Sequence, residues 1–294
     1  MKHAIVGVGG VGGLMAAALA HVGEHVTVIV RPKTYARYPE KLKLESMFGN
    51  FEVPVERATE LRGWYDIIWL AVKATQLEET LSTISAAKDG FGAIVPLLNG
   101  VDHIEELRCL YGGERVIPAT IAVESERVAP GHIRHKSPFV RLAVASWGKA
   151  KLEGVLQKLS DFGFTCEFVD DEKTLMWRKL IFLAPFALAT SASGLPAGGL
   201  RNALWRDRWF DAIREAGAVA KAEGAKVDVD AAIKMSESLP DTMTSSMFKD
   251  ITAGNTPELD AIAGPILRGG EKHGIPTPNV SGLAKEIEAK ISPR

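Results

Sequence analysis

A glycine-rich loop near the start of the chain restricts the possible folds more than any other feature of the sequence. Residues 7–12 read Gly-Val-Gly-Gly-Val-Gly. The loop follows an apolar, β-rich run at 2–6 and opens an alanine-rich segment at 10–22, and a second β-rich run follows at 25–30. The order strand, glycine loop, helix, strand is that of a Rossmann βαβ unit. The sequence therefore predicts a parallel sheet that binds a dinucleotide.

Each glycine of the loop has a role in such a unit. Gly7 makes the tight turn, Gly9 lets the backbone approach a pyrophosphate, and Gly12 lets the helix pack closely on the strand. The first amides of the helix then face the phosphates. The predicted cofactor-binding residues of the loop are Gly7, Val8, Gly9, Gly10, Val11 and Gly12. The alternative, a glycine-rich turn without a ligand, is disfavoured by the complete βαβ context.

The residue at the end of the second predicted strand indicates which dinucleotide binds. NAD-binding units carry an acidic residue there, whereas this chain has Arg31, followed by Lys33. A guanidinium can bind the 2′-phosphate of NADP(H) through two parallel hydrogen bonds, so NADP(H) is preferred to NAD(H). The open alternative is that Arg31 is only a solvated loop residue. Lys73, at the end of another predicted strand, is a further candidate cofactor neighbour.

The pattern along the chain changes from mixed to helical. The first part alternates apolar strand-like runs, at 66–72 and 92–98, with helical segments at 76–87 and 103–110. Strands are expected between 116 and 144 and at 165–169, with a helix at 149–161. The rest predicts helices, at 172–189, 201–223, 229–237, 244–251, 257–273 and 280–291. We therefore expect an α/β protein with a Rossmann-type parallel-sheet domain at 1–170 and an all-helical domain at 171–294.

Composition excludes several classes of protein. With 46% hydrophobic residues, 24% charged residues and a formal net charge of −1, the chain has no general attraction for nucleic acid. Two separated cysteines, Cys109 and Cys166, predict no disulfide framework, and the histidines show no metal-ligand spacing. A secretory signal at 4–20 is disfavoured by its glycines, and no membrane span is expected. These features favour a cytoplasmic protein, and no hydrolase elbow or Walker motif occurs.

Six segments carry a resemblance to a known family. They are "GVGGVG" at 7–12, "VKATQ" at 72–76, "NGVDHIEEL" at 99–107, "LMWRKL" at 175–180, "SSMFKDI" at 245–251 and "PELDAIAGPILRGGEKHGIPTP" at 257–278. In this order and spacing the sequence resembles the ketopantoate reductases, or 2-dehydropantoate 2-reductases, of pantothenate biosynthesis. The resemblance implies a Rossmann domain, a helical domain like the C-terminal domain of 6-phosphogluconate dehydrogenase, a cleft between them, and NADPH-dependent reduction of a 2-keto acid to a 2-hydroxy acid.

Lys179 is the candidate for the chemical step. Its neighbours three and four residues away on a helix are all apolar: Leu175, Met176, Phe182 and Leu183. Desolvation lowers the pKa of such a lysine, and a positioned ammonium can stabilise and protonate the oxygen of a ketone that receives a hydride. From the pattern alone, a lysine that extends its head to solvent is an equal alternative. The resemblance implies the catalytic role.

Three further residues match functional positions of the family. Glu258 is expected in the first turn of a helix that Thr256 caps and Pro257 starts, where a carboxylate is favourable in any case. The resemblance implies that Glu258 is catalytic, that Asn99 contacts cofactor, substrate and lysine, and that Ser246 binds the substrate carboxylate. Asn99 also suits an Asn-Gly turn, and Ser246 suits a packing position within a helix.

The sequence departs from the family at two positions. Ketopantoate-recognising members carry asparagines one and two turns after the catalytic lysine, and here Leu183 and Ala187 stand there. Loss of two amides predicts a different or more hydrophobic 2-keto acid. A β-hydroxy acid dehydrogenase and a non-catalytic NADPH-binding or sensing protein stay open as alternatives, as does a homodimer.

Overall fold

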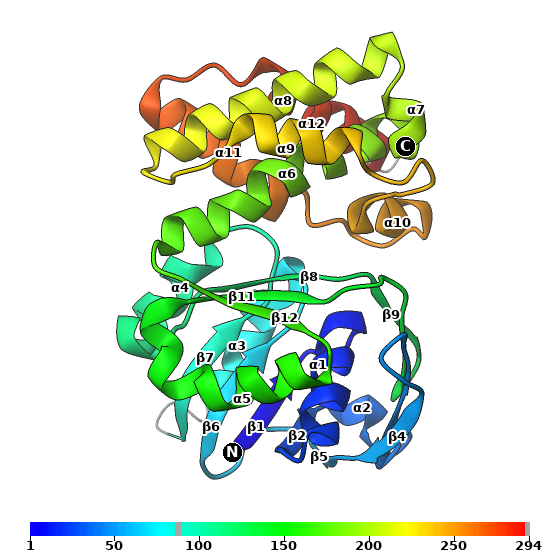
Figure 1. The fold of residues 1–294 in the computed structure, drawn as a ribbon, viewed down its shortest axis with the longest axis vertical. Coiled ribbons are helices and arrows are strands. Elements are labelled where there is room, and N and C mark those ends of the chain that lie inside the picture. Colours follow the sequence, from blue (N-terminus) through cyan, green and yellow to red (C-terminus); the bar gives the residue numbers. More distant parts are fainter. Residues whose placement is uncertain (86–89, 292–294) are drawn as a thin grey trace. The chain divides into compact units, whose positions relative to one another are not determined.

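The chain forms two compact units in the computed structural model, which describes residues 1–85 and 90–291 (Figure 1). The first unit holds residues 1–98 and 103–172, and the second holds 99–102 and the chain from Lys173 onward. The domain boundaries expected from the sequence, 1–170 and 171–294, stay a prediction. They assigned Asn99–Asp102 to the first domain, whereas this short segment belongs to the second unit.

A five-stranded parallel sheet is the centre of the first unit. Its strand order is β5-β2-β1-β6-β7, and the order reverses between β1 and β6, as in Rossmann sheets. The strands are β1 (Lys2–Val6), β2 (His25–Ile29), β5 (Glu56–Ala58), β6 (Tyr65–Leu70) and β7 (Phe91–Pro96). All four pairings within this sheet are parallel. The predicted Rossmann-type fold is therefore confirmed.

Alternating side chains of these strands fill two cores on opposite faces of the sheet. On β1, Ile5 joins the core that includes α1 (Gly10–His21) and α5 (Lys149–Phe162), and Val6 joins the core that includes α3 and α4. The helices of the second face are α3 (Leu77–Ser85) and α4 (His103–Tyr111). Because successive strand residues point to opposite faces, strands covered on both sides are apolar throughout.

Two smaller sheets complete the first unit. One has the order β4-β3-β10-β9 and the other the order β12-β11-β8. Their strands are β3 (Lys41–Glu45), β4 (Phe51–Pro54), β8 (Ala119–Ala122), β9 (Ser125–Ala129), β10 (His132–His135), β11 (Arg141–Ala145) and β12 (Thr165–Val169). The short helical elements are α2 (Pro32–Tyr35), η1 (Ala74–Gln76), η2 (Gly113–Arg115) and η3 (Ser146–Gly148). The sequence did not predict β3, β4 or β5.

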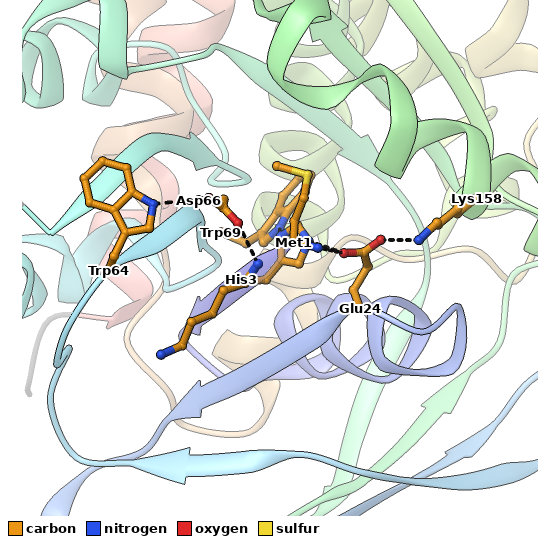
Figure 2. A network of polar contacts seen from close by, with 8 residues as sticks. Met1, His3, Glu24, Trp64, Asp66, Trp69 and Lys158 are labelled. Atoms are coloured by element: carbon orange, nitrogen blue, oxygen red, sulfur yellow. Dashed lines mark hydrogen bonds and ion pairs between the residues drawn. The ribbon is translucent and has the colours of Figure 1, made fainter.

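A buried polar network ties β1 to the rest of this unit (Figure 2). His3 is fully buried and accepts a hydrogen bond from the Trp69 indole at 3.1 Å, and its other ring nitrogen lies 3.4 Å from Glu24. Glu24 also binds the Met1 ammonium and the Lys158 ammonium. Burial raises the pKa of Glu24, but the hydrogen bonds from Lys158 and Met1 outweigh it and lower the pKa to about 2. The network is therefore held by an ionised carboxylate.

The second unit is helical. Its elements are α6 (Glu172–Ser193), α7 (Ala197–Leu200), α8 (Ala203–Ala222), α9 (Val229–Glu237), α10 (Ser246–Thr252), α11 (Leu259–His273) and α12 (Pro278–Ile291). Buried apolar residues of α6, α8, α11 and α12 form one core. Among the described residues, α6 is the one helix long and apolar enough to cross a membrane, but 78% of its most apolar window is buried. Its buried side chains belong to this core.

Several predicted helix ends differ from the structure. The segment expected to be helical at 172–189 continues to Ser193, and Pro185 lies inside the helix. The helix expected at 201–223 begins two residues later, and the short α7 occupies the Pro/Gly-rich stretch before it. Of the helix expected at 76–87, residues 77–85 form α3, and its last two residues lie outside the described part of the chain.

Candidate active site

Lys179 stands on α6 with its ammonium held inside the protein. Its Nζ donates a hydrogen bond of 3.0 Å to Oδ1 of Asn99, and the side chain is half-buried. The alternative in which the head extends freely into solvent does not describe this structure. Burial lowers the pKa of Lys179 to about 8, although the Glu258 carboxylate raises it in part. The lowered pKa makes the ammonium of Lys179 a stronger acid than an ordinary lysine, and the hydrogen bond to Asn99 fixes its position.

Asn99 follows the end of β7 and begins the segment that belongs to the second unit. The next residue, Gly100, has φ +85°, and a Cβ there would lie 2.3 Å from the carbonyl oxygen of Ala261 on α11. Only glycine fits this turn and this close approach. The turn residue predicted from Asn-Gly is thus present, and it packs the Asn99 segment against α11.

Glu258 lies at the start of α11. Its side chain is 8% exposed, and its Oε2 accepts a hydrogen bond of 3.2 Å from Nδ2 of Asn99. The expectation that Thr256 caps this helix and that Pro257 starts it is wrong. The helix starts at Leu259, Glu258 itself is the N-cap residue, and its side chain makes no capping hydrogen bond. The Glu258 carboxylate is instead directed to Asn99.

The three side chains form one hydrogen-bonded series within the second unit. The Asn99 amide accepts from an ammonium through its oxygen and donates to a carboxylate through its nitrogen. The reverse orientation would place an amide N–H₂ against the ammonium, so the network itself fixes the amide. Three residues separated widely in sequence are therefore brought together in one place.

Ser246 is not inside a helix, as the sequence suggested, but is its first residue. It is exposed at the start of α10, and the preceding residue, Ser245, is the N-cap, whose hydroxyl accepts a hydrogen bond from the amide of Phe248. The helix had been expected to begin at Thr244. Serine is a preferred N-cap residue type, so Ser245 could have been proposed from the sequence as the residue before the helix.

The glycine loop has the geometry that a dinucleotide needs. Gly7 has φ +95°, and a Cβ on Gly12 would lie 2.0 Å from the carbonyl oxygen of Gly7. In contrast, a Cβ on Gly9 would meet no atom within 4 Å. Gly7 and Gly12 are thus required by the turn and by packing, whereas Gly9 leaves open space above the backbone. The residues present fit a pyrophosphate.

The other residues of the loop hold it in place. Val8 is buried and Val11 packs against the core beneath the helix. A Cβ on Gly10 would lie 2.1 Å from the carbonyl oxygen of Ser125, and the Ser125 hydroxyl donates a 2.9 Å hydrogen bond to the carbonyl of Gly10. Strand β9 therefore covers the start of α1, a contact that the sequence did not reveal.

Two cations stand near the carboxyl ends of strands in the central sheet. Arg31 is the residue before α2, and its guanidinium, with 52% of the side chain exposed, lies 4.0 Å from Glu79. Lys73 follows β6 and precedes η1. An exposed ion pair at this distance contributes little stability. No cluster of potential metal ligands occurs among the residues that the structure describes.

The surface beside Lys179 on α6 is apolar. Phe182 and Leu183, one turn further along the helix, are half-buried, whereas Ala187 at the second turn is fully buried. Phe182 stacks on Phe186 with 6.2 Å between ring centroids. The partly exposed residues one turn beyond Lys179 on this helix are therefore an aromatic ring and a leucine side chain, neither of which can hydrogen-bond to a ligand.

Comparisons with known proteins identify the family of the chain. The family profile described as "Ketopantoate reductase PanE/ApbA" matches residues 3–148, and its C-terminal counterpart matches residues 171–290. A 2-dehydropantoate 2-reductase from Caulobacter vibrioides is 30% identical over 94% of both chains. These matches cover both units.

Solved structures are similar over nearly the whole chain. A 2-dehydropantoate 2-reductase from Geobacter metallireducens is 26% identical, with a TM-score of 0.88 over 98% of this chain and 99% of that one. D-mandelate dehydrogenase, solved with NADH and anilino(oxo)acetate, is 23% identical with a TM-score of 0.88 over 99% of this chain and 98% of that one, and it shares the fold. The same arrangement of elements is thus present in proteins of similar length.

Proposed function

Because the chain belongs to the ketopantoate reductase family, whose members are oxidoreductases acting on CH–OH groups, we propose that it reduces a 2-keto acid to a 2-hydroxy acid with NADPH. One observation carries this proposal: the hydrogen-bonded series of Lys179, Asn99 and Glu258. An ammonium with a lowered pKa, held by an amide and a buried carboxylate, has the chemistry needed to protonate a ketone oxygen.

Lys179 acts as the general acid in this proposal. Negative charge builds on the ketone oxygen as the carbon is reduced, and the ammonium stabilises that charge and donates a proton to form the hydroxyl. Lys179 is left neutral and regains a proton from water. Asn99 and Glu258 hold the ammonium in one direction, and Glu258 also accepts from the new hydroxyl.

The carboxylate of the substrate binds at Ser246 in this proposal. The hydroxyl of Ser246 is exposed at the start of α10, so it can donate to a ligand without breaking a buried contact. Binding at this serine fixes one end of the substrate, which places the ketone at a defined distance from the lysine. The catalytic residues proposed are therefore Lys179 and Glu258, with Asn99 and Ser246 binding substrate.

NADPH is the proposed cofactor, and it supplies a hydride to the ketone carbon when bound. Residues 7–12 bind the pyrophosphate with their backbone amides, and the open space at Gly9 supports this assignment. Arg31, which stands where NAD-binding units carry an acid, pairs with the 2′-phosphate, and Lys73 lies beside the dinucleotide. Asn99 and Glu258 also contact the cofactor in this proposal.

The proposed substrate has an apolar side chain. Phe182 and Leu183 are the accessible neighbours of Lys179 on α6, and they offer dispersion contacts but no hydrogen bond. A hydroxyl on the substrate side chain would lose its water there without gaining a partner, which costs free energy. We therefore propose a 2-keto acid with a branched or aromatic hydrocarbon side chain rather than 2-dehydropantoate.

A spectrophotometric screen tests this function. NADPH or NADH is mixed with the protein and with pyruvate, 4-methyl-2-oxopentanoate, phenylpyruvate or 2-dehydropantoate, and loss of the reduced cofactor is followed. We expect NADPH to be used in preference to NADH, and kcat/KM to be higher for the two apolar side chains than for 2-dehydropantoate. If no keto acid oxidises either cofactor, the proposed reaction is wrong. If 2-dehydropantoate has the highest kcat/KM of the four keto acids, the proposed apolar substrate site is wrong.

A pair of variants tests the apolar site directly. Leu183→Asn is expected to shift the ratio of kcat/KM toward 2-dehydropantoate by about tenfold or more, because an amide then meets the substrate hydroxyl. The control is Leu204→Asn on α8, which introduces the same residue at a position that is 72% exposed. It should leave the ratio unchanged.

The alternatives predict different results once 3-hydroxy acids with NADP⁺ are added to the same screen. A non-catalytic NADPH-binding or sensing protein would bind the cofactor without oxidising it. A β-hydroxy acid dehydrogenase would oxidise 3-hydroxy acids and not reduce 2-keto acids, and the asparagine usual one turn after its lysine is Leu183 here. A homodimer and a cytoplasmic location stay predictions made from the sequence.

A further inference from the structure

A buried hydrogen bond joins α6 to the start of α10. Oγ1 of Thr190 lies 2.8 Å from Oγ of Ser245. The two residues are 0% and 4% exposed, so water does not compete for either hydroxyl. Neither residue has a role in the reaction proposed above. The bond nevertheless connects the helix that carries Lys179 to the residue that precedes Ser246.

The protons of the two hydroxyls can be assigned from their other partners. Thr190 donates its proton to the carbonyl of Phe186 at 2.8 Å, one turn earlier on α6. The Ser245 oxygen accepts from the amide of Phe248 as the helix cap. Since each hydroxyl has one proton, the Ser245 hydroxyl donates to Thr190. The series runs from the first turn of α10, through Ser245, to the backbone of α6.

The position of Thr190 on α6 makes this series relevant to the reaction. Thr190 lies about three full helical turns beyond Lys179, so both side chains leave α6 on similar faces. Ser245 and Ser246 are adjacent, so the bond that holds one fixes the backbone of the other. Leaving one partner of a buried hydrogen bond unsatisfied is costly, so the two segments are held at this spacing.

We infer that Thr190 is a positioning residue for substrate binding: through its hydrogen bond to Ser245 it sets where Ser246 stands relative to Lys179. The inference rests on the proposed function, in which Ser246 binds the substrate carboxylate. It goes beyond that function because the hydroxyl of Thr190 touches neither substrate nor cofactor. The side chain acts only by fixing the start of α10.

Thr190→Val tests the inference, because valine keeps the shape and removes the hydroxyl. We expect KM for the best 2-keto acid to rise about fivefold to thirtyfold with kcat within about twofold, since a loss of 1–2 kcal/mol changes an equilibrium by that factor. Hydrogen exchange at the amide of Phe248 should become faster, because Ser245 no longer has its acceptor. Thr190→Ser, which restores a hydroxyl, should return both measurements toward the wild type.

Ser236→Ala is the matched control. Ser236 on α9 is fully buried and its hydroxyl also donates to the carbonyl one turn earlier, that of Ala232 at 2.9 Å. The Ser236→Ala variant removes a buried hydroxyl that bonds to its own helix, and it leaves the bond between α6 and α10 intact. KM and the exchange rate at Phe248 should therefore stay at the wild-type values.

Each result decides a separate point. If Thr190→Val leaves hydrogen exchange in α10 unchanged, the Thr190–Ser245 hydrogen bond does not fix the start of α10, and the inference is wrong. If exchange becomes faster but KM is unchanged, the bond fixes α10 without affecting substrate binding, which also contradicts the inference. Should the valine variant fail to fold, Thr190→Ala removes the same hydroxyl while leaving the Ser245 cap on Phe248 in place, and it must give the same two changes. If the wild type is inactive, the proposed function is wrong instead. Hydrogen exchange at Phe248 in the wild type and Thr190→Val still tests whether Thr190 fixes the start of α10.

Discussion

Lys179 occupies a position where its charge is costly and its direction is fixed. Burial disfavours the ammonium, and the Asn99 oxygen and the nearby Glu258 carboxylate offset part of that cost. A lysine placed only for stability would gain nothing from such a site, because an apolar residue would fit α6 at lower cost. The residue therefore fits a group whose task is to give up a proton.

The lowered pKa predicts how activity depends on pH. The proposed ketone reduction uses the protonated form of Lys179, so kcat measured with saturating NADPH and keto acid should fall as the pH rises through about 8. Unfolding does not explain such a fall. Between about 8 and the usual lysine pKa the unfolded chain binds more protons than the folded one, so this group makes the protein more stable as the pH rises. A kcat that stays constant to pH 10 would contradict the role of Lys179.

Sequence patterns identified residues more readily than their contacts. Lys179, Asn99 and Glu258 were predicted from motifs far apart in the chain, and the structure places them in one series. The pattern could not show that Asn99 connects the other two, because that depends on how the segment after β7 folds. Thr190 was missed because a threonine in an apolar helix has no sequence signal that distinguishes a bond across helices from a bond to its own helix.

Local patterns predicted most of the regular elements. Strands covered on both faces read as continuous apolar runs, and the glycine loop fixed the position of α1 between β1 and β2. The missed strands are short. In β3, buried Leu42 and Leu44 alternate with exposed lysines, a period-2 pattern that spans only five residues. Pairing with distant strands, not local preference, makes these residues strands.

The Glu24 network should stabilise the strand β1. Glu24→Gln replaces an ionised carboxylate that accepts from Met1 and Lys158 (Figure 2), so we expect the free energy of unfolding of the first unit to fall by about 1–3 kcal/mol at pH 7. The measurement is native-state hydrogen exchange at the amides of β1, which does not assume that the two units unfold together.

The effect of pH on this variant follows from the lowered pKa. A carboxylate whose pKa falls from 4.5 to about 2 on folding contributes its stability above pH 4.5 and loses it as the pH falls through 2. The difference between wild type and Glu24→Gln should therefore decrease over that window. Glu52→Gln, at an exposed position of β4, is the control and should have little effect. An equal loss in both variants would refute the role of the network.

At the scale of the whole chain, the change of periodicity after residue 171 predicted a sheet unit followed by a helical unit. The fold class is confirmed by the strand order and by the helical core of α6, α8, α11 and α12. The assignment of Asn99–Asp102 to the second unit could not be predicted, because four residues carry no periodicity. Gly100 packs closely on Ala261 of α11, which holds this segment in the second unit. The same segment carries Asn99, which accepts the hydrogen bond from Lys179.

The most direct test of the proposed reaction is the turnover of Lys179→Ala. With a 2-keto acid that the wild type reduces, the account predicts that the variant still binds NADPH, because the proposed dinucleotide residues at 7–12 and Arg31 belong to the first unit. It also predicts that kcat falls by about a hundredfold or more, the usual contribution of general acid catalysis. Turnover within a few-fold of the wild type would show that another group protonates the ketone and would contradict the account.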